Sequence, residues 1–118
     1  MVRLSSDLSL ELRREGDVAF VSARGDIDLS TLAKAVAALG EARAGARTLI
    51  FDLREVGFMD TSGLRLVIEE QRRAQEGGYR FAVVPGSRRV QRLFEIAGLA
   101  GDDELFIDAP TPPAGGGG

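Results

Sequence analysis

The sequence contains no cysteine, no histidine and no tryptophan among its 118 residues. Without cysteine there are no disulfide bonds, thiol nucleophiles or thiolate metal sites, and without histidine the commonest general base and metal ligand is missing. The only lysine is Lys34, and neither the Gly-x-Ser-x-Gly motif of serine hydrolases nor a phosphate-binding P-loop occurs. These absences exclude most familiar enzyme chemistry.

The chain also lacks an excess of positive charge and long apolar runs. Lys and Arg number 15 against 18 for Asp and Glu, so the net charge is −3 and no basic stripe marks a nucleic-acid surface. No apolar run reaches membrane-spanning length, and the first residues lack the apolar segment of a signal peptide. We therefore expect a cytoplasmic protein without direct nucleic-acid binding or membrane insertion.

Length and composition predict a single globular domain. Hydrophobic residues make up 44% and charged residues 28%, which is ordinary for a folded protein with one core. The end of the chain, APTPPAGGGG, has no residues from which a core can form. We predict a folded domain over residues 1–108 and a disordered tail rich in proline and glycine over residues 109–118.

Strand and helix patterns alternate along the folded part. Leucines at every second position from Leu8 predict a strand with one buried face, and the apolar runs 18–23, 48–53 and 79–84 predict buried strands. Apolar residues at helical spacing follow each of the runs 18–23, 48–53 and 79–84, which predicts three helices. The run 105–107 predicts a short edge strand. The resulting order, β-β-α-β-α-β-α-β, predicts an α/β fold with a mixed sheet of four to five strands covered by three or more helices.

Apolar spacing also predicts which face of each helix is buried. The first helix has Asp28 and Ser30 as candidate caps, and its apolar positions at helical spacing are Leu29, Leu32, Val36 and Leu39. The third helix has Ser87 as candidate cap and Gly98 just past its end, and its predicted inner residues are Val90, Leu93, Phe94 and Ala97. For the second helix the predicted inner residues are Leu64, Val67, Ile68, Gln71, Ala74 and Gln75. Leu66 falls among the outward charges beside Arg65.

A polar turn, Asp60-Thr61-Ser62-Gly63, precedes the second helix. Helix capping accounts for one acid and one hydroxyl, because Asp, Thr and Ser all accept hydrogen bonds from amides at a helix N-terminus. Capping does not account for the second hydroxyl. A glycine in the first turn lowers helix stability by about 1 kcal/mol relative to alanine. We expect Gly63 to give clearance to a partner and Leu66 to add apolar contact.

Two enzymatic interpretations of the acidic residues are weaker. Asp-Thr-Ser-Gly resembles the loop of aspartic proteases, but its spacing differs by one residue and a helical pattern follows it, whereas those proteases are all-β. The acids DDE at residues 102–104 follow Gly101 and predict a solvated turn in preference to a metal site.

Four segments resemble the STAS domain family of bacterial anti-sigma factor antagonists. FMDTSGL at residues 58–64 resembles the family signature Asp-Ser-[Ser/Thr/Ala]-Gly-Leu, with Thr61 in place of the usual serine. GDID at 25–28, LIFDLREVGFMD at 49–60 and VQRLFEIAGL at 90–99 resemble other family segments in order and spacing. The resemblance covers about residues 8–108.

The resemblance implies a protein that functions by binding, is not an enzyme and uses no cofactor. Antagonists of this family capture an anti-sigma factor, which is also a serine/threonine kinase, and so release a sigma factor. Phosphorylation by that kinase ends the capture, and a phosphatase restores it. The phosphoacceptor position corresponds to Thr61, with Ser62 as the less favoured acceptor and the helix cap. Together with Arg65, which departs from the family pattern, and with Leu66 from the helix pattern, the predicted partner-binding residues are Asp28, Asp60, Thr61, Ser62, Gly63, Arg65 and Leu66.

The expected switch is electrostatic. A phosphate adds about −1.5 to −2 charge beside Asp60 and near Asp28, which opposes docking of a desolvated surface. The N-terminus of the second helix is expected to accommodate part of this charge without refolding.

Alternative functions stay open. STAS subunits of lipid-transporting ABC systems also carry threonine in this motif and bind an ATPase in place of a kinase. An aspartate-dependent hydrolase would show turnover that Asp60→Asn abolishes. The sequence also leaves open a homodimer and the identities of the sigma factor, the kinase and the signal.

Overall fold

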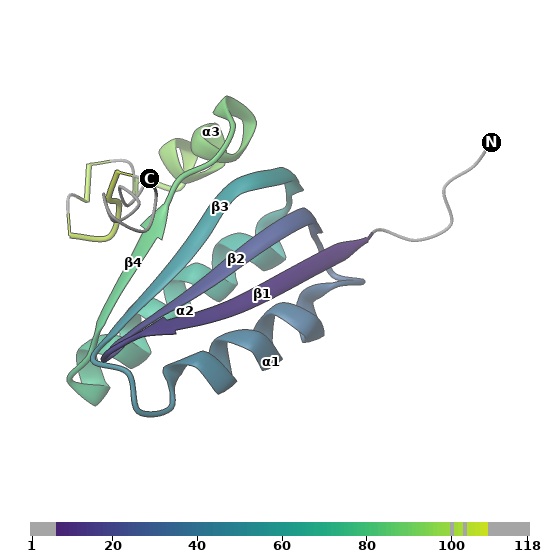
Figure 1. The fold of residues 1–118 in the computed structure, drawn as a ribbon. Coiled ribbons are helices and arrows are strands. Elements are labelled where there is room, and N and C mark those ends of the chain that lie inside the picture. The colour runs from purple at the N-terminus through teal and green to yellow at the C-terminus, as the bar shows by residue number, and fades with distance from the viewer. Residues whose placement is uncertain (1–6, 100, 103, 109–118) are drawn as a thin grey trace, which may run out of the picture.

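The structure is a computed structural model that describes residues 7–99, 101–102 and 104–108. Its elements are β1 (Leu8–Glu15), β2 (Val18–Ile27), α1 (Leu32–Arg43), β3 (Thr48–Met59), α2 (Thr61–Gly77), β4 (Arg80–Val84) and α3 (Arg88–Ile96). This order confirms the predicted α/β class and the succession of strands and helices up to α3 (Figure 1).

The four strands form one mixed sheet in the order β1-β2-β3-β4. β1 and β2 are an antiparallel hairpin closed by Gly16 and Asp17, and Gly16 adopts a φ of 61° that favours glycine. β2, β3 and β4 run parallel, so the loops that follow β2 and β3 emerge at the same edge of the sheet.

The predicted fifth strand at residues 105–107 is a single β-bridge in the described part of the chain. Phe106 pairs with Val83, whose N–H donates to the carbonyl of Leu105 at 2.7 Å and whose carbonyl accepts from Ile107 at 3.0 Å. Asp102 holds the preceding residues in a turn, since its carboxylate accepts the N–H groups of Glu104 and Leu105. The described residues after that turn pair with β4 through this one bridge and form no strand.

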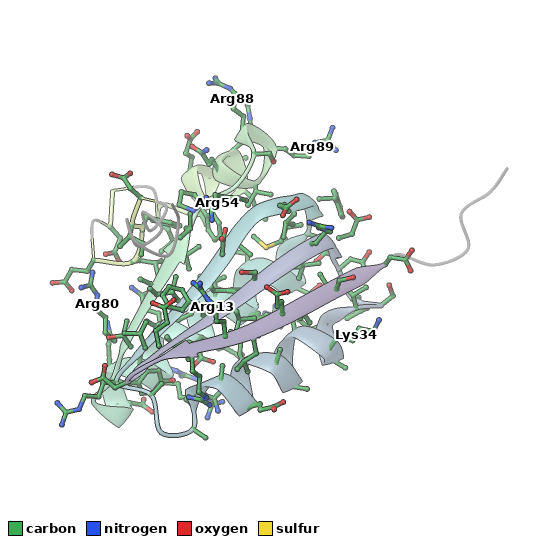
Figure 2. All side chains as sticks on the ribbon, in the orientation of Figure 1. Arg13, Lys34, Arg54, Arg80, Arg88 and Arg89 are labelled. Carbon is green, nitrogen blue, oxygen red and sulfur yellow. The ribbon has the colours of Figure 1, made fainter. Side chains whose placement is uncertain are left out.

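The core lies between one face of the sheet and the helices. α1 and α2 share this core with the inward residues of β2 and β3, and α3 lies near the carboxyl ends of β3 and β4 (Figure 1). On the opposite face, Arg13 stacks 4.3 Å above the ring of Phe20, and Arg54 pairs with Asp52 at 2.7 Å. Figure 2 shows Arg13 and Arg54 over the strands on the side away from α2.

The structure corrects the predicted inner face of α1. Leu29 lies before the helix and is 78% exposed, and Val36 is 49% exposed. The buried residues of α1 are Ala35, Leu39 and Ala42, which also recur at helical spacing. Small alanine side chains let the helix axis approach the sheet closely, so the helix is rotated and its larger apolar residue Val36 points outward.

The inner face of α2 is also rotated from the prediction. Leu66, expected among the outward charges, is buried at 9% exposure, whereas Ile68 is 42% exposed. The buried residues are Gly63, Leu66, Val67, Glu70 and Ala74. Glu70 occupies the middle of this face, a position that apolar spacing does not select.

A salt bridge explains why Glu70 is buried. Both oxygens of its carboxylate accept from the Arg43 guanidinium, at 2.9 and 3.0 Å, and the carboxylate also accepts from the Tyr79 hydroxyl. Burial, followed by the hydrogen bond to Glu70, raises the pKa of Tyr79 to about 12. The network joins α1, α2 and the turn before β4.

The sequence signals for α3 are largely confirmed. Ser87 is its N-cap and accepts the N–H of Val90 at 3.3 Å, while Val90 and Phe94 are buried. Gly98 has a φ of 81°, and the N–H of Leu99 folds back to the carbonyl of Phe94 at 2.9 Å. The predicted inner residue Ala97 is exposed, because the helix ends at Ile96.

Candidate functional site

The candidate site lies where the loop after β2 meets the start of α2. Ile27 and Met59 are paired at the ends of parallel strands β2 and β3, and the N–H of Asp60 donates to the carbonyl of Ile27 at 3.1 Å. The β2–α1 loop and the first turn of α2 are therefore held side by side by the sheet.

Asp60 caps α2. Its carboxylate accepts the N–H of Ser62 at 2.8 Å, and its carbonyl accepts the N–H groups of Gly63 and Leu64 at 3.1 and 3.2 Å. Ser62 was expected to be the cap, but its hydroxyl donates to the Asp60 carboxylate. The expectation is wrong because the helix begins at Thr61, one residue too early for Ser62 to occupy the capping position.

Thr61 is the hydroxyl residue that the turn presents. It is exposed at the first position of α2. Within the described part of the chain its hydroxyl makes no hydrogen bond, whereas the hydroxyl of Ser62 is occupied by Asp60. The structure thus separates two adjacent hydroxyls by their environment.

Gly63 gives clearance inside the molecule, and its contact with a partner stays a prediction. The residue is buried, and a Cβ atom added there would lie 2.3 Å from Met59 Cγ, 2.6 Å from Met59 Sδ and 3.0 Å from Ile27 Cγ2. Glycine is therefore required because the first turn of α2 packs directly on the ends of β2 and β3.

Asp28 organises the loop before α1 without capping the helix. Its Oδ1 accepts the N–H groups of Ser30 and Thr31 at 2.9 and 3.2 Å and the Ser30 hydroxyl at 2.6 Å. The N-cap is Thr31, which makes no side-chain capping bond, and its hydroxyl donates to the carbonyl of Asp26 at 2.8 Å. This bonded loop presents the apolar side chain of Leu29 to solvent.

A surface hollow of about 360 Å³ lies between α1 and the first turns of α2. We call it the α1–α2 hollow. It is lined by Leu29, Leu32, Val36, Asp60, Thr61, Ser62, Arg65, Leu66 and Glu69. The structure thus brings together five of the predicted site residues, while Gly63 lies beneath them and Asp28 supports the adjoining loop.

Sequence reasoning missed two apolar residues of this hollow. Leu29 and Val36 were assigned to the core because their spacing is helical, but both are exposed. The available signal was the series of alanines at positions 35, 38 and 42, which also fits a helix face and allows closer packing on the sheet.

The family model described as the STAS domain matches residues 9–108. The chain belongs to the STAS domain family. Among curated relatives of this STAS domain, the anti-sigma-B factor antagonists of Staphylococcus aureus strains NCTC 8325 / PS 47 and COL are each 28% identical over 94 residues, covering 79% of this chain and 87% of the relative.

Solved structures support the same fold for the STAS domain. An anti-sigma factor antagonist from Mycobacterium paratuberculosis has a TM-score of 0.70 at 24% identity, covering 89% of this chain and 87% of that protein. The unphosphorylated anti-sigma factor antagonist SpoIIAA has a TM-score of 0.67 at 22% identity, covering 86% and 89%. The phosphorylated form of the Bacillus cell fate determinant SpoIIAA has a TM-score of 0.68 at 21% identity, covering 86% and 92%.

Among residues 7–99, 101–102 and 104–108, no helix is long and apolar enough to cross a membrane. The same residues contain no group of three acids placed to hold a metal ion. Of the acids at 102–104, Asp102 accepts a hydrogen bond from Gln71 at 2.9 Å, which lowers its pKa, and residue 103 lies outside the described residues.

Proposed function

We propose that this STAS domain is an anti-sigma factor antagonist, which binds an anti-sigma factor that is also a serine/threonine kinase and thereby releases a sigma factor. The observation that carries the proposal is the exposed Thr61 hydroxyl, which lines the α1–α2 hollow and makes no hydrogen bond to the described residues. The names of the Staphylococcus aureus relatives support it. The protein acts by binding, without catalysis of its own, in the cytoplasm where sigma factors and ATP are found.

The α1–α2 hollow has the chemistry of a docking surface. Leu29 is 78% exposed and Val36 49% exposed, so a partner that covers them removes apolar area from water. Full burial of one such side chain contributes about 1.5–3 kcal/mol. Arg65 and Glu69 supply one positive and one negative charge at the same surface. These charges favour a partner that places opposite charges against them.

Phosphorylation of Thr61 is the proposed off switch. The Thr61 oxygen forms a bond to the γ-phosphorus of ATP, the bond between that phosphorus and the β–γ bridging oxygen breaks, ADP leaves, and the hydroxyl proton passes to a base of the kinase. The product carries about −1.5 to −2 additional charge next to Asp60. A phosphatase hydrolyses the new bond with water and restores the threonine.

The fold is compatible with this modification. The Thr61 hydroxyl makes no hydrogen bond to the described residues, so its loss removes no contact that holds α2. The bonds that fix the first turn come from Asp60 and remain in place. We therefore expect phosphorylation to block the partner by charge and bulk while the domain stays folded.

The test is the affinity of the anti-sigma factor for variants at position 61. Thr61→Ala should bind within about twofold of wild type, and Thr61→Glu should bind at least tenfold more weakly, because a loss of 1.4 kcal/mol is tenfold in affinity. Ser9→Glu, at an exposed serine of β1, is the matched control for the added charge and should bind like wild type.

Two outcomes would contradict the proposal. One is a Thr61→Glu variant that binds the anti-sigma factor as tightly as wild type. The other is co-purification of the wild-type protein with a lipid-transporter ATPase and with no anti-sigma kinase.

A further inference from the structure

We propose that Arg65 binds the phosphate of phosphorylated Thr61 within the same chain, so that phosphorylation both adds charge and withdraws Arg65 from the partner. The inference rests on the proposed phosphorylation of Thr61 and deepens it. It assigns to Arg65 a role in the phosphorylated state that partner binding alone does not require.

Thr61 and Arg65 are neighbours on one face of α2. They are four residues apart in the helix, a spacing that places their Cβ atoms about 5–6 Å from each other. Both are exposed and both line the α1–α2 hollow. A guanidinium presents a planar fork of donors that matches two phosphate oxygens, so the pair has the reach and the geometry to meet.

Three of the amides in the first turn of α2 are already bonded and are not free to take the phosphate. The N–H of Ser62 donates to the Asp60 carboxylate, and the N–H groups of Gly63 and Leu64 donate to the Asp60 carbonyl. At the helix N-terminus the phosphate therefore meets the helix dipole and the N–H of Thr61 itself, which makes no hydrogen bond to the described residues, while the next three amides are occupied.

Arg65 is the available charged side-chain donor. It is the one cation among the described residues that line the hollow, and within the described chain it forms no ion pair or hydrogen bond. Glu69 is four residues further along the helix and is the carboxylate with which Arg65 can pair in the unmodified protein. A phosphate, with a larger charge than a carboxylate, competes effectively for the same guanidinium.

In this arrangement phosphorylation has two effects: it adds negative charge to the hollow, and it removes Arg65 from the docking surface. Without Arg65, a phosphate would stand beside the carboxylates of Asp60 and Glu69 in one hollow. When Arg65 binds the phosphate, it neutralises part of the phosphate charge. The same Arg65 side chain is then no longer available to contact a docking partner. Arg65 thus stabilises the inactive state while it is removed from the active surface.

The test is a phosphorus NMR titration of the full chain with phosphothreonine installed at position 61 during translation, which requires no kinase. In the otherwise wild-type chain the second phosphate pKa should lie below its ordinary value of about 6. In Arg65→Ala the phosphate pKa should rise by about half a unit, with Arg65→Lys between the two. Arg72→Ala, at an exposed arginine further along α2, is the control and should leave the phosphate pKa unchanged.

The outcomes separate this inference from the proposed function. An equal phosphate pKa in the wild-type background and in Arg65→Ala, with both proteins shown to be folded by circular dichroism, overturns the role of Arg65. Phosphothreonine at 61 that leaves the affinity for the anti-sigma factor unchanged overturns the proposed switch, whatever the titration shows. A lowered phosphate pKa that depends on Arg65 supports the inference independently of any partner.

Discussion

At the scale of single residues, the first turn of α2 is organised by what each neighbour contacts. Asp60 caps the helix, Ser62 donates to that cap, and Gly63 admits the side chain of Met59. Thr61 has no such task inside the fold. The Thr61 hydroxyl makes no hydrogen bond to the described residues and is exposed, so it is available for modification. This availability is the physical basis of the proposed switch.

Gly63→Ala should lower the free energy of unfolding by about 1–3 kcal/mol, the usual cost of overpacking a core. The added methyl would lie 2.3 Å from Met59 Cγ, and Met59 is 5% exposed with little room to move. Urea denaturation of wild type and variant measures the change.

A double-mutant cycle and a second glycine provide the controls. In a Met59→Ala background the cost of Gly63→Ala should fall, because the clashing atoms are gone. Gly40→Ala in α1 should stabilise by about 0.4–1 kcal/mol, since its Cβ would meet only Arg43 Nη1 at 3.8 Å. A Gly63→Ala protein as stable as wild type would contradict the packing argument.

At the scale of elements, the Arg43–Glu70–Tyr79 network fixes how α1 and α2 lie on the sheet. The Glu70 side chain is 3% exposed and that of Arg43 27% exposed, so the salt bridge is shielded on one side and hydrated on the other. The network joins α1 and α2, the two helices that border the α1–α2 hollow, and the turn before β4.

The stability of the domain should fall as pH rises from about 10 to about 12. Tyr79 loses its proton near pH 10 in the unfolded chain but only near 12 in the folded one, so in this window the unfolded state binds fewer protons and is favoured by rising pH. Denaturation at several pH values in wild type and Tyr79→Phe measures the difference, and the variant should show the shallower decline.

Tyr79 can be followed directly. It is the only tyrosine in a chain without tryptophan, so the ultraviolet absorbance of tyrosinate reports its ionisation alone. A folded protein whose absorbance changes with a midpoint near 10 would contradict the raised pKa.

At the scale of the whole molecule, the end of the domain is set by residues that return to the core. Leu105 is 1% exposed, and the rings of Phe94 and Phe106 meet edge to face with centroids 4.9 Å apart. Phe106 also forms the bridge to β4. The domain boundary that we propose at residue 108 thus follows the last contacts described with α3 and β4.

A chain ending at Asp108 should keep the melting temperature of the full chain and its affinity for the anti-sigma factor. A chain ending at Glu104 should lose about 2–5 kcal/mol of stability, because it lacks the buried side chain of Leu105 and the contacts of Phe106. Thermal unfolding followed by circular dichroism distinguishes the two. If both truncations melted together, the boundary would have to be moved.

The elements with strong local signals were predicted correctly. The hairpin turn at Gly16, the cap at Ser87 and the C-terminal Gly98 of α3 each depend on a residue type whose backbone or side-chain preference acts over a few positions. The buried faces of α1 and α2 were assigned less well. Apolar spacing indicates that a helix has an inner face, but alanines and a paired glutamate contribute little to that pattern.

The sequence by itself determined the order of strands and helices up to α3, the family signature and the position of Thr61 at the start of α2. The tertiary structure alone decided that Asp60 and not Ser62 is the cap, that Gly63 makes room for Met59, and that Leu29 and Val36 face solvent beside Arg65. The reason is physical. Capping preferences and helical period act within a few residues, whereas the α1–α2 hollow exists only because parallel pairing of β2 and β3 brings residues far apart in the chain to one edge of the sheet.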